Sequence, residues 1–267
     1  NKTIAFTGAY TRKAIDPNTK FMFRAYSTPV EYVGPMIEWL RQNQPEGKRN
    51  VVLLNPNDET GWDAVELQEA NYKAKGFKVV GKELYERTLK DFQPLLTKAL
   101  AAKPDIIELG TSSPATAGLI VRQARELGYQ GRFIKIGGPG PRDIVAGAGV
   151  ANAEGVLNFL LADRSSDGYK RLAEEYRKRN GHEVNEIMFG FYDAARILFA
   201  AIQKAGTISD TDKVRQAIPQ VMPFKSAFGV DLTLTGKQSY GADTQIVTTS
   251  YVGEIRKGEP VVLGIAK

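Results

Sequence analysis

Short apolar runs alternate with segments of helical periodicity between residues 77 and 136. Apolar runs at 77–84, 104–110 and 132–137 are typical of buried strands, and the intervening segments 91–103 and 112–128 repeat their apolar residues at helical spacing. Strands that alternate with helices in this way form a parallel sheet, because each helix carries the chain back to the start of the next strand. The pattern therefore predicts an α/β fold.

The segment 112–128 shows the helical pattern together with signals for both helix ends. Ser113 before Pro114 predicts an N-cap, and Gly128 predicts the C-terminal stop. The apolar residues that recur on one face are Ala117, Ile120, Val121, Ala124 and Leu127. Ligands of open parallel sheets bind beyond the carboxyl ends of the strands. The loops that start at Asn55, Gly110 and Gly137 are therefore where a binding site is expected.

The preceding and following residues extend this α/β unit. Helices are predicted at 29–41 and 62–75, and strands at 51–54 and 155–161, with a short helix near Asp143. Together with the alternating segment they predict one compact lobe.

The chain then changes character. Three consecutive helices are predicted at 167–179, 186–204 and 211–217 with no strand between them. The middle helix has an apolar stripe that must pack against another element, and a second sheet is its natural partner. The residues of this stripe are Met188, Phe191, Ala195, Leu198 and Ile202.

Strands for a second sheet are few. Candidates lie at 3–6, 228–234, 245–255 and 261–265, separated by glycine and lysine turns. Because they flank the helical segment on both sides, the chain is predicted to cross between two lobes repeatedly.

Composition narrows the class of protein. The 36 basic and 30 acidic side chains are interleaved, as in the solvated helix 169–179, so the formal charge of +6 indicates no nucleic-acid partner. The absence of cysteine excludes disulfides and cysteine nucleophiles, and the single histidine, His182, follows Gly181 at a predicted helix end. No phosphate-binding loop or nucleophile motif is present. Asp58, Glu59 and Asp63 fit solvated charges better than a cation site, so neither a metal nor a cofactor is predicted.

Several short motifs, in their order and spacing, resemble one family. They are Asp91-Phe92 opening a helix, 103–107 before Gly110, the segment 122–128, the segment 191–194 and the segment 200–206. On these motifs the chain resembles extracytoplasmic solute-binding proteins of the branched-chain amino acid type, which serve ABC importers.

The resemblance implies a two-lobed periplasmic binding protein type I fold, with parallel sheets flanked by helices. It assigns 1–26 and 163–235 to the first lobe and 27–162 and 236–267 to the second. Family members carry roughly a hundred further residues before the position of Asn1, so the first lobe is expected to be incomplete in this chain. Either the sequence is a fragment or a second chain supplies the rest.

The resemblance also nominates ligand-binding residues. In the family, the loop after the strand at 3–6 binds the ligand carboxylate through backbone N–H and hydroxyl groups, which assigns Ala9, Tyr10 and Thr11 here. The alternative for this loop is a plain turn with threonine as a helix cap. Thr60 stands where the family places an aromatic residue in the cleft, with an N-cap for the helix from Trp62 as its alternative.

Two further positions complete the predicted site. Ser112 and Ser113 occupy a place where amino-acid binders often have tyrosines, and helix capping is the alternative for both. Gly137 lies in the loop where such binders present a carboxylate to the ligand's ammonium group. Glycine cannot pair with a cation, and burial of an unpaired ammonium group is costly. The predicted ligand is therefore an anionic or neutral compound, such as an aromatic or aliphatic carboxylate, unless Glu108 or Asp163 replaces the missing acid.

The predicted function is capture of a small ligand between two lobes, for delivery to the membrane subunits of an ABC transporter, without enzymatic chemistry. The expected location is periplasmic or extracellular, with or without a lipid anchor. Three alternatives remain at this stage: a sensory module of the same fold, a true branched-chain amino acid binder, and an α/β enzyme.

Overall fold

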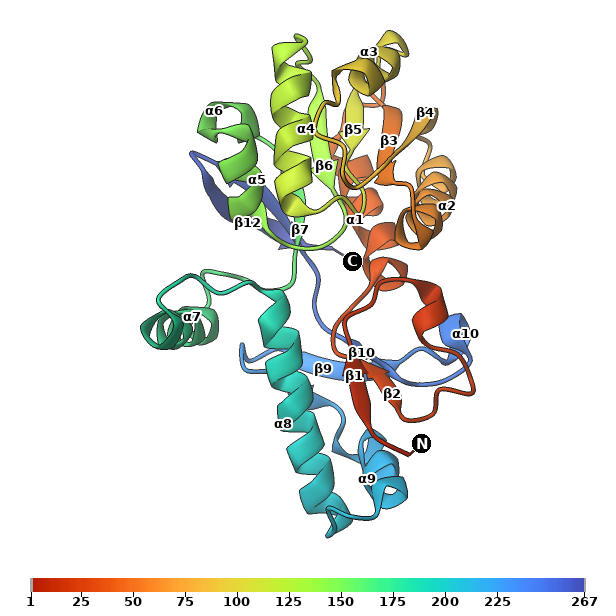
Figure 1. Ribbon diagram of the computed structural model, residues 1–267, viewed down its shortest axis with the longest axis vertical. Coiled ribbons are helices and arrows are strands. Elements are labelled where there is room, and N and C mark those ends of the chain that lie inside the picture. Colours follow the sequence, from red (N-terminus) through yellow and green to blue (C-terminus); the bar gives the residue numbers. More distant parts are fainter. Residues whose placement is uncertain (1, 267) are drawn as a thin grey trace. The chain divides into compact units, whose positions relative to one another are not determined.

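The computed structural model describes residues 2–266, which form two compact units (Figure 1). The first unit contains residues 2–28 and 161–249, and the second contains 29–160 and 250–266. The assignment from sequence had placed 236–249 with the second lobe. In the structure this segment lies in the first unit, because β10 (Gln245–Val247) pairs with strands of that unit's sheet.

The second unit is built on a seven-stranded sheet with the order β12-β11-β7-β6-β5-β3-β4. The five strands from β7 to β4 are parallel, as the sequence predicts, and β11 and β12 add an antiparallel edge. The strands are β3 (Asn50–Pro56), β4 (Lys78–Tyr85), β5 (Ile106–Glu108), β6 (Arg132–Lys135), β7 (Leu157–Leu160), β11 (Tyr251–Arg256) and β12 (Glu259–Ile265).

Helices cover both faces of this sheet. On one face the core joins Val52 and Ile107 of the sheet to Phe92, Leu96 and the apolar stripe of α4. The opposite face meets α1 and α2, and there the ring of Tyr32 stacks on Phe159 with centroids 3.9 Å apart. The helices are α1 (Pro29–Asn43), α2 (Glu59–Ala74), α3 (Gln93–Ala101), α4 (Pro114–Glu126), α5 (Pro141–Ala148) and α6 (Val150–Ala153).

The end signals of α4 are confirmed. Ser113 is the N-cap, since its side chain accepts a hydrogen bond from Thr116 N at 3.1 Å. Gly128 follows the helix with φ of +85°. For α2 the predicted cap was wrong: the helix begins at Glu59, and the Asp58 side chain accepts from Gly61 N at 3.1 Å.

The first unit contains a five-stranded sheet with the order β1-β2-β10-β9-β8. β1, β2 and β10 are parallel, and β9 and β8 continue the sheet antiparallel. The short strand β2 was not predicted. The remaining elements are β1 (Ala5–Thr7), η1 (Arg12–Ala14), β2 (Met22–Arg24), α7 (Asp167–Asn180), α8 (Ile187–Ala205), α9 (Thr211–Ala217), η2 (Pro219–Val221), β8 (Phe224–Lys225), β9 (Asp231–Thr235) and α10 (Lys237–Tyr240).

Two predictions for this region need correction. The single strand predicted at 245–255 is two strands, β10 and β11, because the chain leaves one sheet and enters the other between them. The apolar stripe of α8 is also not the face that packs inside the unit. Met188 is 47% exposed and Phe191 is 36% exposed, whereas the buried face is made by Phe189, Asp193, Ala194, Ile197 and Ala201. None of the helices within residues 2–266 has the length and apolar character that a membrane span requires.

Close packing of α4 on α5 generates a stability prediction. A Cβ atom on Gly118 would lie 2.5 Å from the carbonyl oxygen of Ile144, which is backbone and cannot rotate away. We expect Gly118→Ala to lower the free energy of unfolding by about 1–3 kcal/mol because the two helices must separate. Chemical denaturation measures the change. Gly47→Ala is the matched control, since a Cβ there meets no atom within 4 Å; equal stability of the two variants would contradict the packing argument.

Candidate functional site

The candidate site of the second unit consists of the loops that follow β5 and β6. Both leave the carboxyl ends of parallel strands, and they lie in direct contact. A Cβ atom on Gly137 would be 2.7 Å from the carbonyl oxygen of Gly110. Glycine at 137 is therefore required by the approach of the two loops, and no side chain can project from this position without moving one of them.

A buried carboxyl group forms hydrogen bonds with both of these loops from inside the unit. Glu108 at the end of β5 is fully buried, and its Oε1 accepts from the backbone N–H of Gly110 at 2.9 Å and of Ile136 at 3.0 Å. Its Oε2 accepts from the hydroxyl of Tyr72 in α2 at 2.8 Å. One side chain thus fixes two loops that are 26 residues apart in the chain.

Burial dominates the electrostatics of this group. It raises the pKa of Glu108 to about 7, although the hydrogen bonds from Ile136, Tyr72 and Gly110 and the nearby charge of Lys135 oppose the shift. Lys135 is equally buried, and burial lowers the pKa of its ammonium group to about 7. Its Nζ donates to the carbonyl oxygen of Gly138 at 2.9 Å, so this lysine holds the glycine loop from the inside.

A second polar network supports the same edge of the sheet. Asn55, at the end of β3, accepts from Thr111 N at 3.0 Å through its Oδ1 and donates to Gln68 Oε1 at 2.9 Å. Ser112 is buried and accepts from the hydroxyl of Tyr85 at 2.6 Å. The loop from Gly110 to Ser113 is thus fixed at several points by side chains from the neighbouring strands.

The predicted residues of the second unit fall into two groups. Ser112 and Gly137 lie in the two loops that Glu108 holds together, whereas Ser113 is exposed and caps α4. Thr60 lies in the first turn of α2 and is half-buried. The two acids considered as partners for an ammonium group are both engaged: Glu108 as described, and Asp163 by the N–H and hydroxyl of Ser165 at 2.8 and 2.7 Å.

The candidate site of the first unit is the loop Thr7–Thr11 after β1. Its carbonyl oxygens are held from inside the unit: that of Thr7 accepts from Ala25 N at 3.0 Å, and that of Gly8 accepts from the Tyr26 hydroxyl at 2.9 Å. The Thr11 hydroxyl accepts weakly from Lys13 N at 3.4 Å, which is the capping alternative considered for this loop. The N–H of Ala9 donates to Thr7 Oγ1 at 3.1 Å, so this group is engaged within the loop.

An aromatic cluster adjoins this loop. The ring of Tyr26 meets that of Tyr10 at 6.0 Å and that of Phe191 at 5.8 Å between centroids, both in edge-on geometry. Burial raises the pKa of the Tyr10 hydroxyl, and the neighbouring Tyr26 adds to the shift. Tyr10 therefore stays neutral and contributes an aromatic ring to the loop.

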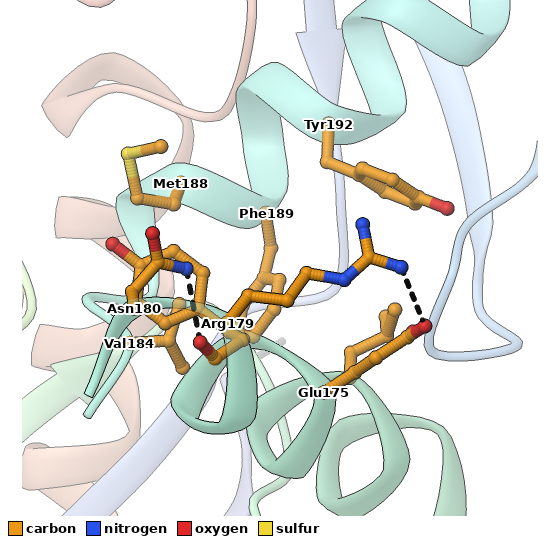
Figure 2. A pocket seen from close by; sticks show the side chains of 9 residues that line it. Glu175, Arg179, Asn180, Val184, Met188, Phe189 and Tyr192 are labelled. Atoms are coloured by element: carbon orange, nitrogen blue, oxygen red, sulfur yellow. Dashed lines mark hydrogen bonds and ion pairs between the residues drawn. The ribbon is translucent and has the colours of Figure 1, made fainter. Parts of the chain in front are cut away.

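The first unit also has a groove between α7 and α8, with a volume of about 270 Å³ (Figure 2). Apolar side chains such as Met188, Phe189 and Tyr192 line most of it, and the ion pair of Glu175 and Arg179, 3.0 Å apart, lies at its edge. None of the residues predicted to bind ligand lines this groove. Within residues 2–266 no group of three histidine, aspartate or glutamate side chains is placed to hold a metal ion.

The fold and these loops define a class of protein, namely a two-unit α/β binding protein whose candidate loops leave the ends of parallel strands. The sequence pattern of the periplasmic binding protein family matches residues 1–260, and the chain belongs to that family. It is a family of solute-binding proteins rather than enzymes, with an extracytoplasmic location implied by its name.

Individual relatives agree with this assignment. The leucine-, isoleucine-, valine-, threonine- and alanine-binding protein of Pseudomonas aeruginosa is 28% identical over 171 residues, which are 64% of this chain and 45% of that protein. Leu/Ile/Val-binding protein homolog 2 of Brucella abortus is 27% identical over 223 residues, or 83% of this chain and 57% of that protein. The chain thus spans about half the length of the curated relatives it matches.

Solved structures share the fold. A leucine-binding protein of Thermotoga maritima superposes with a TM-score of 0.84 at 22% identity, covering 100% of this chain and 74% of that one. A solute-binding protein from R. palustris in complex with benzoate superposes with a TM-score of 0.75 at 17% identity, covering 92% and 66%.

The buried position of Glu108 predicts a pH dependence of stability. Between the ordinary carboxyl pKa of 4.5 and about 7, Glu108 keeps its proton in the folded protein and loses it in the unfolded chain. Relative to Glu108→Gln, the wild-type protein should therefore be most stable below about pH 4.5 and lose roughly 1–3 kcal/mol as the pH rises to about 7. Denaturant unfolding of both proteins across this range measures the difference.

Glu174→Gln is the control for this measurement. Glu174 is exposed, and its hydrogen bond with Lys178 lowers the pKa of its carboxyl group. Any change of stability with pH that Glu174 contributes therefore has the opposite sign to that of Glu108. Parallel stability profiles of the wild type and Glu108→Gln would show that Glu108 titrates normally.

Proposed function

We propose that this chain belongs to the solute-binding component of an ABC importer and that its ligand is a small carboxylate other than a standard α-amino acid. The proposed ligand class rests on the contact of Gly137 with Gly110, which leaves no room for an acidic side chain at position 137. The nearby carboxylate of Glu108 is engaged by three donors and faces the protein interior. An ammonium group at these loops would therefore lack a charged partner.

The structural neighbours support a carboxylate of this kind. Two R. palustris solute-binding proteins of the same fold are in complex with benzoate and with 4-hydroxybenzoate, the second with a TM-score of 0.74 at 19% identity. In this chain, the ring of Tyr10 within the loop Thr7–Thr11 and the neighbouring ring of Phe191 would suit an aromatic acid. Binding would proceed by capture alone, and no side chain would perform chemistry on the ligand.

A branched-chain amino acid is the second candidate ligand, because the relatives from Pseudomonas and Brucella are named for such ligands. It requires an acceptor for the ammonium group other than position 137, such as the hydroxyl and carbonyl oxygens of the loop Gly110–Ser113. A sensory module of the same fold is a further alternative that binding measurements alone do not distinguish. For the importer component, the partners would be the transporter's membrane subunits, and the protein would be free or lipid-anchored outside the cytoplasm.

Isothermal titration with benzoate, 4-hydroxybenzoate, leucine and valine tests the proposed ligand class. We expect heat from at least one benzoate and none from leucine or valine, because only the amino acids bring an ammonium group to loops without a free carboxylate. Gly137→Ala should weaken the binding of the carboxylate at least about tenfold, since the added Cβ displaces the loop Gly110–Ser113. Gly47→Ala is again the control, and micromolar binding of leucine would overturn the proposal.

We also propose that a further polypeptide segment covers the exposed face of α8 in the functional protein. Met188, Tyr192 and Phe199 are 47%, 49% and 68% exposed, so one helix presents three large, mainly apolar side chains to solvent. Support comes from the relatives, which are about twice as long as the region they share with this chain. Native mass spectrometry of the protein from its producing cells should show additional polypeptide mass. The mass of these 267 residues alone, with cooperative unfolding, would contradict this part of the proposal.

A further inference from the structure

The side chain of Arg24, at the end of β2, is buried without a counter-ion. Its exposure is 0%, and its guanidinium group makes a single hydrogen bond, from Nη2 to the carbonyl oxygen of Thr11. The Nε and Nη1 atoms are buried and have no partner. The group lies over the ring of Tyr240 at 4.5 Å from its centroid, and no carboxylate within residues 2–266 forms an ion pair with it.

A buried cation in this state is costly. Removal of a charged group from water is compensated only by an opposite charge and by hydrogen bonds to its remaining donors. The carbonyl oxygen of Thr11 and the face of Tyr240 supply part of this compensation. An anion brought near the group would supply the rest, and its most direct approach is along the loop that Arg24 holds.

The loop itself has the polarity that an anion requires. Its carbonyl oxygens at Thr7, Gly8 and Thr11 are all turned inward, to Ala25 N, the Tyr26 hydroxyl and Arg24 respectively. In a planar trans peptide the N–H of the next residue points away from the carbonyl oxygen. The N–H of Gly8, which follows the inward carbonyl of Thr7, is therefore directed to the outer side of the loop, whereas the N–H of Ala9 is engaged by Thr7 Oγ1.

The family resemblance already implies that the loop Thr7–Thr11 binds the ligand carboxylate. We propose that Arg24, buried behind this loop, is the residue that makes it prefer a carboxylate to an uncharged group of the same shape. Arg24 is a positioning residue in this assignment, because it acts through the Thr11 peptide and through its charge without touching the ligand. The inference rests on the proposed function for the ligand class but holds for the carboxylate end of any small acid.

Titration of two matched probes tests the role of Arg24. Benzoate and benzamide share one ring and differ in charge. The wild-type protein should prefer benzoate about tenfold or more. In Arg24→Met the ratio of the affinities for benzoate and benzamide should fall toward one, while the affinity for benzamide changes less than about twofold. Arg24→Lys should recover part of the preference for benzoate. A merely structural role would weaken both probes equally, and that result would overturn the proposal.

Arg49→Met is the matched control. Arg49 also has an Nε atom without a partner, donates to one backbone carbonyl and lies over a phenylalanine ring, but it precedes β3 at the opposite end of the strands from the candidate loops. It should keep the wild-type preference for benzoate. Loss of the preference in this variant too would show that removal of an arginine from the protein produces the effect whatever its place in the fold.

A second pair of probes, acetate and acetamide, shows whether the role of Arg24 is wrong or only the proposed ligand class is wrong. If the wild type binds leucine and no benzoate, the proposed ligand class is wrong. Arg24 is then judged from thermal unfolding, where acetate should raise the midpoint more than acetamide in the wild type and in Arg49→Met. The difference should vanish in Arg24→Met and return in part in Arg24→Lys. An equal effect of both probes on the wild-type protein would reject the carboxylate subsite, even where Arg24→Met fails to fold.

Discussion

The candidate loops of both units depend on charged side chains that are buried at the ends of strands. In the second unit Glu108 accepts from two loops at once, and Lys135 donates to the carbonyl oxygen of Gly138. In the first unit Arg24 donates to the carbonyl oxygen of Thr11. A loop that leaves a buried parallel strand has peptide groups that water cannot reach, so they need partners from the protein. An ionisable side chain serves this purpose because one carboxyl, ammonium or guanidinium group offers several acceptors or donors at once.

This arrangement has an electrostatic cost, which is visible in the shifted pKa values of Glu108 and Lys135. Apolar residues of similar volume would often be more stable at such positions. They would leave the N–H groups of Gly110 and Ile136 without an acceptor, and the two loops would lose their common support. The retained charges are therefore best understood as fixing the loops in one conformation, which is what a binding site needs and what a core alone does not require.

The sequence predicts the regular elements well, because their signals are local. Ser113 and Gly128 mark the two ends of α4, and the parallel strands of the second unit follow from their alternation with helices. The features that were predicted wrongly have one property in common: they depend on contacts between residues that are distant in sequence. The strand predicted at 245–255 is interrupted where the chain changes sheets, and the apolar stripe of α8 is exposed because the helix buries its other face.

The burial of these charged residues was missed for a similar reason, although Glu108 was considered as a partner for a ligand. Glu108 follows Ile106 and Ile107, Lys135 follows Phe133 and Ile134, and Arg24 follows Phe23, so each charge closes a short apolar run. In a strand with one solvated face such a residue points to water. Glu108 and Lys135 are buried because helices cover both faces of the sheet of the second unit. A charged residue at the last position of a strand with both faces covered is the signal that could have identified them.

The two cations act on their loops in the same way but with different consequences. Lys135 turns the carbonyl oxygen of Gly138 inward, as Arg24 does for Thr11. The residue after Gly138 is Pro139, which has no N–H, so this peptide presents no donor on its outer side. The residue after Thr11 is not proline, so this peptide keeps an N–H group. The two buried cations therefore differ in what they leave behind them, because only the peptide that follows Thr11 keeps a donor group, and the proposed role of the first loop in carboxylate binding depends on this difference.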